Sequence, residues 1–358
     1  MICKEVEIEF VTPAIVSTRV SDRGYVAPSS YIAATTVRGA LLSSLLYHGY
    51  VDEELVAKEA ERPSVIASPA YPLSGEGKRA LPATLLHIRC KVCKEVRIPQ
   101  DFRITAEGIE GAETLCRNGH PAVESPHPKP VYLSGEKGME DANVSCESPI
   151  NVGMSRYRAS AAGKMLYIYE AISPKSRFWF RVVSLEDVEV PSQQTLWLGR
   201  GITRGFGEAR MRVRSEISFE GLAERMRDAS REGRELLFYS LSPIARVDGD
   251  KYCGYPSRVD LYRLSAKRRG GELRIRNIYG RPIDVSLGWS ITREREGERP
   301  NLFSVAPMGS LVVASPHETS PEDLAMLFLA GTVEDVLGSP ITGLNMLGPA
   351  ELALGENL

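Results

Sequence analysis

The chain has 358 residues, of which 43% are hydrophobic, so it can bury a sizeable core and exceeds the usual size of one domain. Its 46 acidic and 44 basic residues leave a formal net charge of -2, which excludes a global field that draws the protein onto nucleic acid. Residues 150–215 nevertheless hold 11 basic and 5 acidic residues. Binding of a polyanion is therefore expected to be local, and a solvated basic face is the alternative.

The amino terminus, MICKEVEIEF, alternates charged and apolar residues and does not resemble a signal peptide. The apolar run at 324–330 is too short to cross a bilayer. These features predict a soluble cytoplasmic protein without a membrane partner. In that compartment, the six cysteines are expected to be thiols or metal ligands rather than disulfides.

In the first half, the alternation over residues 2–10 predicts a half-buried strand. Helical spacing of leucines follows at 35–50, with a threonine cap before the helix and Gly49 after it. A long insertion rich in proline and glycine then occupies about 63–148, and aromatic and branched residues predict strands at 164–172 and 177–183. A glycine-rich loop at 199–210 closes this half.

The second half begins with a charged, helix-compatible junction at 219–234. Strands are predicted within four segments, 235–247, 273–279, 282–291 and 309–315, and a capped helix at 321–331. The mixed order of strands and helices therefore occurs roughly twice. It predicts an α+β protein with antiparallel sheets, divided into residues 1–220 and 221–358.

The glycine-rich loop reads GRGITRGFGEAR over residues 199–210. Its spacing fits neither the dinucleotide fingerprint nor a Walker loop, and the other kinase motifs are missing. Arginine clamps phosphate and an aromatic ring supports a base, so single-stranded RNA is the favoured ligand. The alternative is a structural turn in which Phe206 packs into the core. A weak repeat of this loop near the carboxy terminus aligns Asn345 with Arg204, so the second copy lacks the positive charge.

The stretch GRGITRGFGEAR resembles the glycine-rich loop of the RAMP superfamily of CRISPR-associated proteins, which are built from ferredoxin-like, RNA-recognition-type domains. VAPSSYIAATTVRGALLSSLL resembles their first helix, and RYRASAAGKMLYIYEAI resembles a segment of one branch. In the second half, LLFYSLSPIARVDG, VSLGWSI and APMGSLVVAS match the same branch. The resemblance covers most of the chain apart from the insertion. The branch is typified by the type III-D effector subunit that holds the 5′ end of guide RNA.

This resemblance implies two tandem ferredoxin-like domains and a noncatalytic guide-RNA-binding subunit of a type III effector complex in antiviral defence. Its implied partners are crRNA, the large and backbone subunits and, indirectly, target RNA. Two of the residues expected to contact RNA have alternatives: Arg38 could pair with a carboxylate, and Tyr157 could be buried. Whether the second half contacts RNA stays open. The residues expected to face RNA are Arg38, Arg156, Tyr157, Arg158, Arg200, Gly201, Arg204, Gly205, Phe206, Gly207 and Arg210.

The insertion carries two pairs of metal-ligand residues, Cys90-x2-Cys93 and Cys116-x3-His120. Each spacing lets one turn present two ligands, and four protein ligands predict a closed structural zinc site. Metal binding would supply folding free energy that this polar insertion lacks. Independent thiols are the alternative, and Cys146 or His127 could replace the fourth ligand. Otherwise Cys3, Cys146 and Cys253 are expected to be core thiols.

Nothing in the sequence links residues into a catalytic group, so the protein is not expected to be an enzyme. Of the five histidines, His120 is assigned to zinc and the others lie far apart in sequence. His48 is expected to end the first helix, and Asp22 to lie in a turn. Two alternatives remain: a metal-independent guide-processing ribonuclease of the same superfamily, and a scaffold that contacts only proteins.

Overall fold

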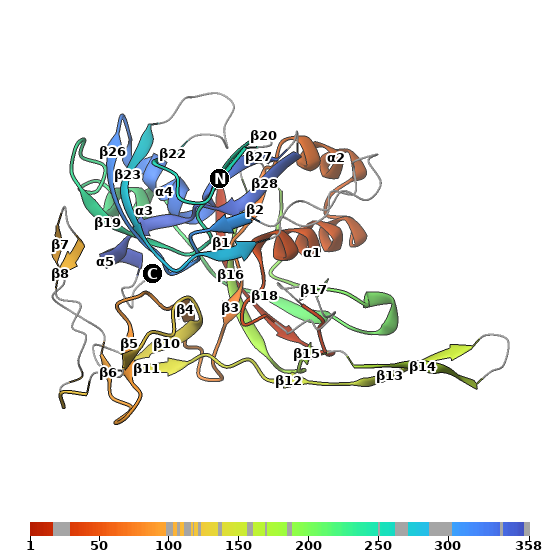
Figure 1. The fold of residues 1–358 in the computed structure, drawn as a ribbon. Helices are drawn as coiled ribbons and strands as arrows, with labels where there is room; N and C mark the ends of the chain where they lie inside the picture. Colours follow the sequence, from red (N-terminus) through yellow and green to blue (C-terminus); the bar gives the residue numbers. More distant parts are fainter. Residues whose placement is uncertain are drawn as a thin grey trace.

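The protein is described by a computed structural model, in which five α-helices accompany several mainly antiparallel sheets (Figure 1). The elements belong to the described part of the chain. The structure describes residues 1–16, 29–97, 103–105, 108–110, 116, 118–120, 123–134, 138–155, 160–168, 170–184, 188–249, 251–261, 271–285, 303–336 and 339–353.

An antiparallel sheet forms the centre of the first half. Its strands are β1 (Ile2–Phe10), β2 (Val65–Ala67), β3 (Tyr71–Pro72), β16 (Arg177–Ser184), β17 (Gln193–Trp197) and β18 (Glu208–Glu216). Strand β1 lies between β16 and β18, with β17 beyond β18, while β2 and β3 both pair with β16. Val6, Ile8 and Phe10 are buried, which confirms the predicted half-buried strand. Glu5 departs from the alternation because it is buried and pairs with Arg79 at 3.1 Å.

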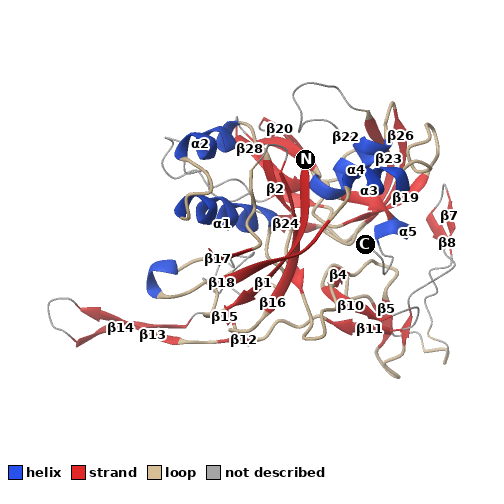
Figure 2. Cartoon of the chain, turned by 180° about the vertical axis from the view of Figure 1, so that it is seen from behind, coloured by secondary structure: helices blue, strands red, loops and turns tan. Residues whose placement is uncertain are grey.

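Two helices, α1 (Ala34–Tyr47) and α2 (Glu53–Glu61), lie beside each other next to this sheet (Figures 1 and 2). Helix α1 packs Val37, Leu41 and Leu45 into the same core as β1, as the leucine spacing predicts. The predicted threonine cap is wrong, because Ala33 takes the capping position without a side-chain hydrogen bond. No helix within the described ranges is long and apolar enough to span a membrane.

The second half contains a five-stranded antiparallel sheet and two helices that pack together. The strands are β22 (Arg258–Asp260), β23 (Glu272–Tyr279), β26 (Leu311–His317), β19 (Leu236–Ser240) and β29 (Leu347–Pro349), in that spatial order. The helices are α3 (Phe219–Arg225) and α4 (Pro321–Ala330). Ser320 and Asp323 form a capping box at the start of α4, which confirms the predicted capped helix. A short helix, α5 (Ala350–Ala353), ends the described chain.

The two large sheets share one plan. Four strands of each sheet follow the same spatial order, β18-β1-β16-β2 in the first half and β29-β19-β26-β23 in the second. A ferredoxin-like unit follows the order β-α-β-β-α-β. Among the described residues, α1 and α2 both lie between β1 and β2 in the first half, and α4 lies between β26 and β29 in the second. The predicted α+β class with antiparallel sheets is therefore present, and two complete ferredoxin-like domains stay a prediction.

A smaller sheet joins the halves. It contains β21 (Lys251–Cys253), β20 (Arg246–Gly249), β27 (Thr332–Val336) and β28 (Ser339–Leu344), and β28 contacts α1, α2 and β2. A hairpin of β24 (Ile283–Val285) and β25 (Phe303–Val305) lies elsewhere in this half. One hydrophobic cluster combines Cys3 and Val183 of the first sheet with Phe238 and Leu327 of the second half. The halves thus share part of their core.

The insertion forms small sheets beneath the two halves (Figure 1). It begins later than the predicted residue 63, because β2 and β3 belong to the main sheet. Its strands are β4 (Ala80–Pro82), β5 (Ile88–Cys90), β6 (Val96–Arg97), β7 (Arg103–Thr105), β8 (Gly108–Glu110), β9 (Val123–Glu124), β10 (Pro130–Ser134) and β11 (Gly138–Asp141). Beyond them, β12 (Cys146–Glu147) pairs with β15 (Ala171–Ile172), and β13 (Ile150–Ser155) pairs with β14 (Ser160–Ile168) in a projecting hairpin.

The carboxy-terminal segment that weakly repeats the glycine-rich loop is buried inside the protein. Asn345 has a positive φ of 58°, and its side-chain amide donates to Ala245 O and Thr332 Oγ1, each at 2.7 Å. Met346 and Leu347, the next two residues, are fully buried. Where the first half exposes arginines, this loop supplies buried hydrogen bonds and apolar contacts.

Candidate nucleic-acid interface and metal cluster

The glycine-rich loop connects β17 to β18 beside α1 (Figure 1). Its middle is one turn of 3₁₀-helix, η1 (Ile202–Arg204), flanked by Gly201 and Gly205 in left-handed conformations. Both ends of the loop touch other backbone: a Cβ on Gly199 would lie 2.4 Å from Ile15 O. At Gly207, the corresponding distance to Leu198 O would be 2.1 Å. Any larger residue would displace the backbone there, so these glycines fix the shape of the loop.

The loop presents its basic side chains outward. Arg200 and Arg204 are exposed, and so is Arg210 on β18. The side chain of Phe206 is half-buried against Gly201, where an added Cβ would lie 3.2 Å from the ring. Phe206 is therefore neither fully exposed nor one of the buried core residues. The loop combines a fixed backbone with exposed guanidinium groups, which is an arrangement that can hold phosphate.

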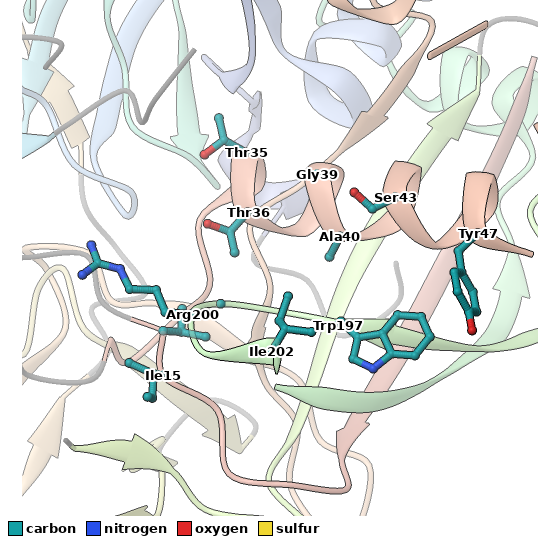
Figure 3. Close-up of a pocket in the computed structure, with 12 residues that line it drawn as sticks. Ile15, Thr35, Thr36, Gly39, Ala40, Ser43, Tyr47, Trp197, Arg200 and Ile202 are labelled. Atoms are coloured by element: carbon teal, nitrogen blue, oxygen red, sulfur yellow. The ribbon is translucent and has the colours of Figure 1, made fainter. Parts of the chain in front are cut away.

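A pocket of about 720 Å³ lies between α1 and the loop (Figure 3). Hydroxyl groups and small side chains of α1 form one wall, and the loop forms the other. Arg200 lies toward one end of the pocket and Trp197 with Tyr47 toward the opposite end (Figure 3). The lining residues are Ile15, Val16, Thr35, Thr36, Gly39, Ala40, Ser43, Tyr47, Trp197, Gly199, Arg200 and Ile202.

Three aromatic rings cluster at that end of the pocket, and sequence analysis did not assign them to the site. The rings of Tyr47 and Trp197 meet edge to face with centroids 5.2 Å apart. His48 stacks on Trp197 with an interplanar angle of 17° and centroids 6.2 Å apart. Tyr47, the last residue of α1, is 74% exposed. The position of Trp197, two residues before the glycine-rich loop, could have indicated from the sequence that it belongs to the site.

Arg38 is placed on the α1 side that faces α2 and β2 rather than among the residues lining the pocket. Its Nη2 donates to Glu59 Oε2 at 2.7 Å, and its Nε donates to Val65 O at 2.7 Å. The Glu59 carboxylate is buried and also accepts from the backbone of Ser64 at 2.8 Å. This is the carboxylate pairing that the sequence left open as the alternative to RNA contact. In this arrangement Arg38 ties together α1, α2 and β2.

Three further residues that are expected to face RNA fall outside the described part of the chain. Arg156, Tyr157 and Arg158 lie between β13 and β14, outside the described residues. Asp22 also lies outside them. Of the predicted RNA-facing set, the structure therefore brings the residues of the glycine-rich loop together and places Arg38 in an internal ion pair.

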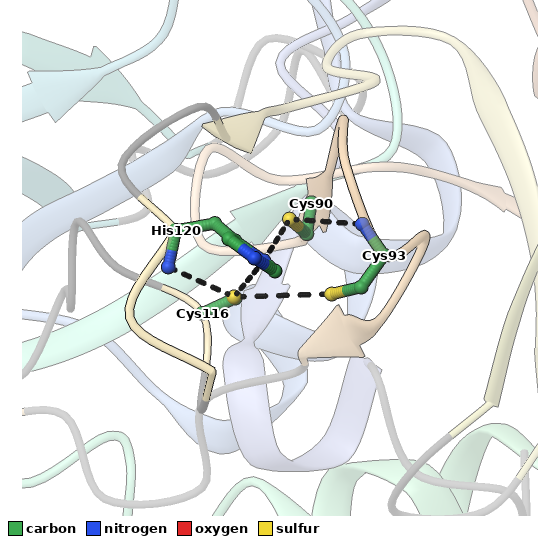
Figure 4. Close-up of side chains that lie close together, drawn as sticks. All are labelled: Cys90, Cys93, Cys116 and His120. Carbon is green, nitrogen blue, oxygen red and sulfur yellow. Dashed lines mark hydrogen bonds between the residues drawn. The ribbon is translucent and has the colours of Figure 1, made fainter.

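The four predicted metal ligands converge in the insertion (Figure 4). Their ligand atoms lie within 4.8 Å of one another. The Cys93 and Cys116 sulfurs are 3.8 Å apart, and His120 Nδ1 lies 3.2 Å from Cys116 Sγ and 3.6 Å from Cys90 Sγ. Two sulfurs bound tetrahedrally at about 2.3 Å would be separated by roughly 3.8 Å. The group therefore has the donor types and the spacing to hold one tetrahedral metal ion.

Hydrogen bonds within the cluster favour the thiolate form of Cys93. The backbone amides of Cys93 and His120 donate to the sulfurs of Cys90 and Cys116 at 3.5 and 3.3 Å. A backbone hydrogen bond from Glu95 and then the His120 side chain lower the pKa of Cys93 to about 6. Thiolate is the form that binds metal, so these contacts favour metal binding at Cys93, whereas desolvation raises the pKa of Cys116.

The alternative ligands lie outside the cluster. His127 Nδ1 is 2.7 Å from Ala83 O, and Cys146 is exposed on β12. The prediction of core thiols is correct for Cys3, which is buried with a pKa raised to about 12 by burial. It is wrong for Cys146 and Cys253, because both are exposed. Short strands at the protein surface carry them, which their isolated sequence contexts did not indicate.

The five histidines do not gather at one site, although His87 and His127 lie near each other. His48 follows α1 as its C-cap, as predicted, and His317 Nδ1 lies 3.0 Å from Glu232 Oε1. His87 and His127 are both buried, and burial followed by the nearby His127 lowers the pKa of His87 to about 4. His120 belongs to the metal cluster.

Comparison with known proteins finds no matching family model and no matching curated protein. Among solved structures, the chain is similar to one from type III-B Cmr-beta bound to cognate target RNA and AMPPnP. The two chains are 12% identical, the match covers 87% of this chain and 86% of the other, and the TM-score is 0.46. A second Cmr-beta structure bound to cognate target RNA gives 11% identity, coverage of 87% and 86%, and a TM-score of 0.44. Pyrococcus furiosus Cmr4 (Cas7) matches at 12% identity over 60% of this chain and 99% of its own, with a TM-score of 0.25.

These similarities are to CRISPR RAMP-type subunits of type III complexes, the class that the sequence motifs resemble. The matched Cmr-beta complexes are of subtype III-B. At these identities and TM-scores the matches assign no residue a role. The argument for function below therefore depends on the loop, the pocket and the metal cluster of this chain.

Proposed function

We propose that this protein is a noncatalytic guide-RNA-binding subunit of a type III CRISPR effector complex, which holds the 5′ region of the guide and contacts neighbouring subunits. The observation that carries the proposal is the glycine-rich loop, whose fixed backbone exposes Arg200 and Arg204 beside the pocket. Guanidinium groups on a rigid loop hold phosphate with little loss of conformational freedom. In this proposal the guide runs along the loop and the adjoining end of β18, where Arg210 is exposed.

The proposal assigns structural zinc to Cys90, Cys93, Cys116 and His120. All four donors come from the protein, so a bound ion would have no open position for a catalytic water. The metal would hold β5 and the segments around it in one fold. The cluster supports the insertion rather than the RNA interface, because its residues do not line the pocket.

Replacement of Arg200 and Arg204 by alanine is expected to weaken binding of single-stranded, repeat-derived RNA by roughly tenfold or more, since each change removes a charge-assisted contact. The slope of log affinity against log salt should fall by about 0.7 for each lost phosphate contact. Fluorescence anisotropy at several salt concentrations measures both quantities. Arg231→Ala is the control, because Arg231 is exposed and pairs with Asp228 in the second half. Unchanged affinity and slope in the double variant would remove the loop from the RNA site.

Incubation of the purified protein with labelled repeat RNA in EDTA is expected to leave the RNA intact, as a noncatalytic subunit should. The choice of EDTA isolates metal-independent cleavage by side chains. Defined cleavage that disappears in His48→Ala would contradict the proposal and support a guide-processing ribonuclease, since His48 adjoins the aromatic end of the pocket.

A further inference from the structure

The aromatic cluster at the end of the pocket has no evident structural need for its exposure. Trp197 belongs to β17, an edge strand of the first sheet, and its side chain is partly buried. Tyr47 stands 74% exposed at the last turn of α1. Exposed aromatic rings that converge at a pocket mark a place where another flat or apolar group binds.

Resting on the proposed function, we infer that Trp197 and Tyr47 form a stacking site for an unpaired nucleobase of the bound RNA, while Arg200 holds a phosphate of the same strand. Single-stranded RNA is bound through this combination, because every base has a face that stacks on an aromatic ring. The rings and the guanidinium group lie toward opposite ends of one pocket (Figure 3). A strand along the pocket would therefore meet both.

The dimensions of α1 support an extended ligand rather than a compact one. Thr36 and Tyr47 both line the pocket and lie 11 positions apart on α1. At about 1.5 Å per residue, the α1 wall is roughly 16 Å long. The small residues between them, Gly39 and Ala40, leave the wall open for a ligand. The hydroxyl groups of Thr35, Thr36 and Ser43 supply hydrogen-bonding groups along this wall.

His48 fixes the position of the tryptophan. Its ring lies nearly parallel to the indole at 17°, with centroids 6.2 Å apart, and Tyr47 meets the indole at 78°. The hydroxyl of the nearby Ser44 also donates to the backbone carbonyl of Thr195, which ties α1 to β17. The stacking surface is thus held in place before a base arrives, which lowers the entropic cost of binding.

The test measures the affinity of the full-length protein for two single-stranded probes of equal length, an oligoadenylate and an RNA strand of abasic ribose units. Trp197→Ala is expected to weaken oligoadenylate binding about tenfold and to leave binding of the abasic strand unchanged, because only the first probe can stack. Trp197→Phe keeps an aromatic face and should bind oligoadenylate close to wild type. Tyr255→Ala, which removes an exposed ring in the second half, is the matched control.

Each other result contradicts the stacking site. Equal affinity of wild type and Trp197→Ala for oligoadenylate would exclude it while leaving the proposed function intact. An equal loss on both probes would show that Trp197 supports the loop rather than a base. Normal RNA binding with loss of co-purifying subunits in Trp197→Ala would assign the pocket to a protein partner. Failure of the wild-type protein to bind either probe would overturn the proposed function as well.

Discussion

Replacement of Cys90 by serine is expected to abolish binding of about one zinc ion per chain and to unfold the insertion around β5, β6 and β9. Cys90 is buried, and its sulfur lies 3.6 Å from His120 Nδ1, so its loss removes a ligand from the centre of the cluster. Structural zinc contributes about 10 kcal/mol or more to folding in small zinc domains. Metal analysis of protein purified without chelators measures the ion, and hydrogen exchange over residues 88–124 measures the order of the segment.

Cys146→Ser is the matched control for this experiment. Cys146 is an exposed thiol on β12, outside the cluster. Its replacement is expected to leave zinc content and hydrogen exchange unchanged. Wild-type protein without zinc, or equal zinc in the wild type and Cys90→Ser, would contradict the assignment of this cluster as the metal site.

Glu59→Gln is expected to lower the free energy of unfolding by about 3–5 kcal/mol, since removal of one partner leaves a buried charge without compensation. Glu59 and Arg38 have side-chain exposures of 3% and 17%, and their ion pair measures 2.7 Å. The carboxylate also accepts from the backbone amides of Ser64 and Val65, at 2.8 and 3.1 Å, and an amide side chain cannot reproduce all of these contacts. Equilibrium unfolding in urea gives the change.

The control for Glu59→Gln lies on the same helix. Glu54 pairs with Lys58 at 2.8 Å, but the two side chains are 75% and 69% exposed, respectively. Solvent screens such a pair, so Glu54→Gln should change stability by only about 0.5 kcal/mol. Equal effects of the two substitutions would show that the Arg38–Glu59 pair does not hold α1, α2 and β2 together.

Features with a strong local pattern could be predicted from the sequence. The alternation in residues 2–10 identified β1, and proline, acidic residues and glycine at the ends of residues 321–331 identified α4. The metal cluster followed from ligand types at short spacing, because each turn brings its own pair together.

Features that depend on pairing between distant segments could not be predicted in the same way. Strand β2 has only three residues, and its assignment depends on pairing with β16, which follows more than 100 residues later. Arg38 looked available for RNA because its partner, Glu59, is on another helix. The pocket depends on the close approach of α1 and the glycine-rich loop, which are separated by most of the first half. Local periodicity contains no information about such contacts.

The central claim is that this chain holds the 5′ region of guide RNA through its glycine-rich loop. The most direct test is to purify the complex with its genomic neighbours, crosslink RNA to protein with ultraviolet light, and sequence the RNA attached to this subunit. The account predicts repeat-derived RNA with one shared 5′ end, and loss of that RNA in the Arg200→Ala, Arg204→Ala double variant. An assembled complex in which this subunit carries no RNA would contradict it and would identify the loop as a surface for protein contact.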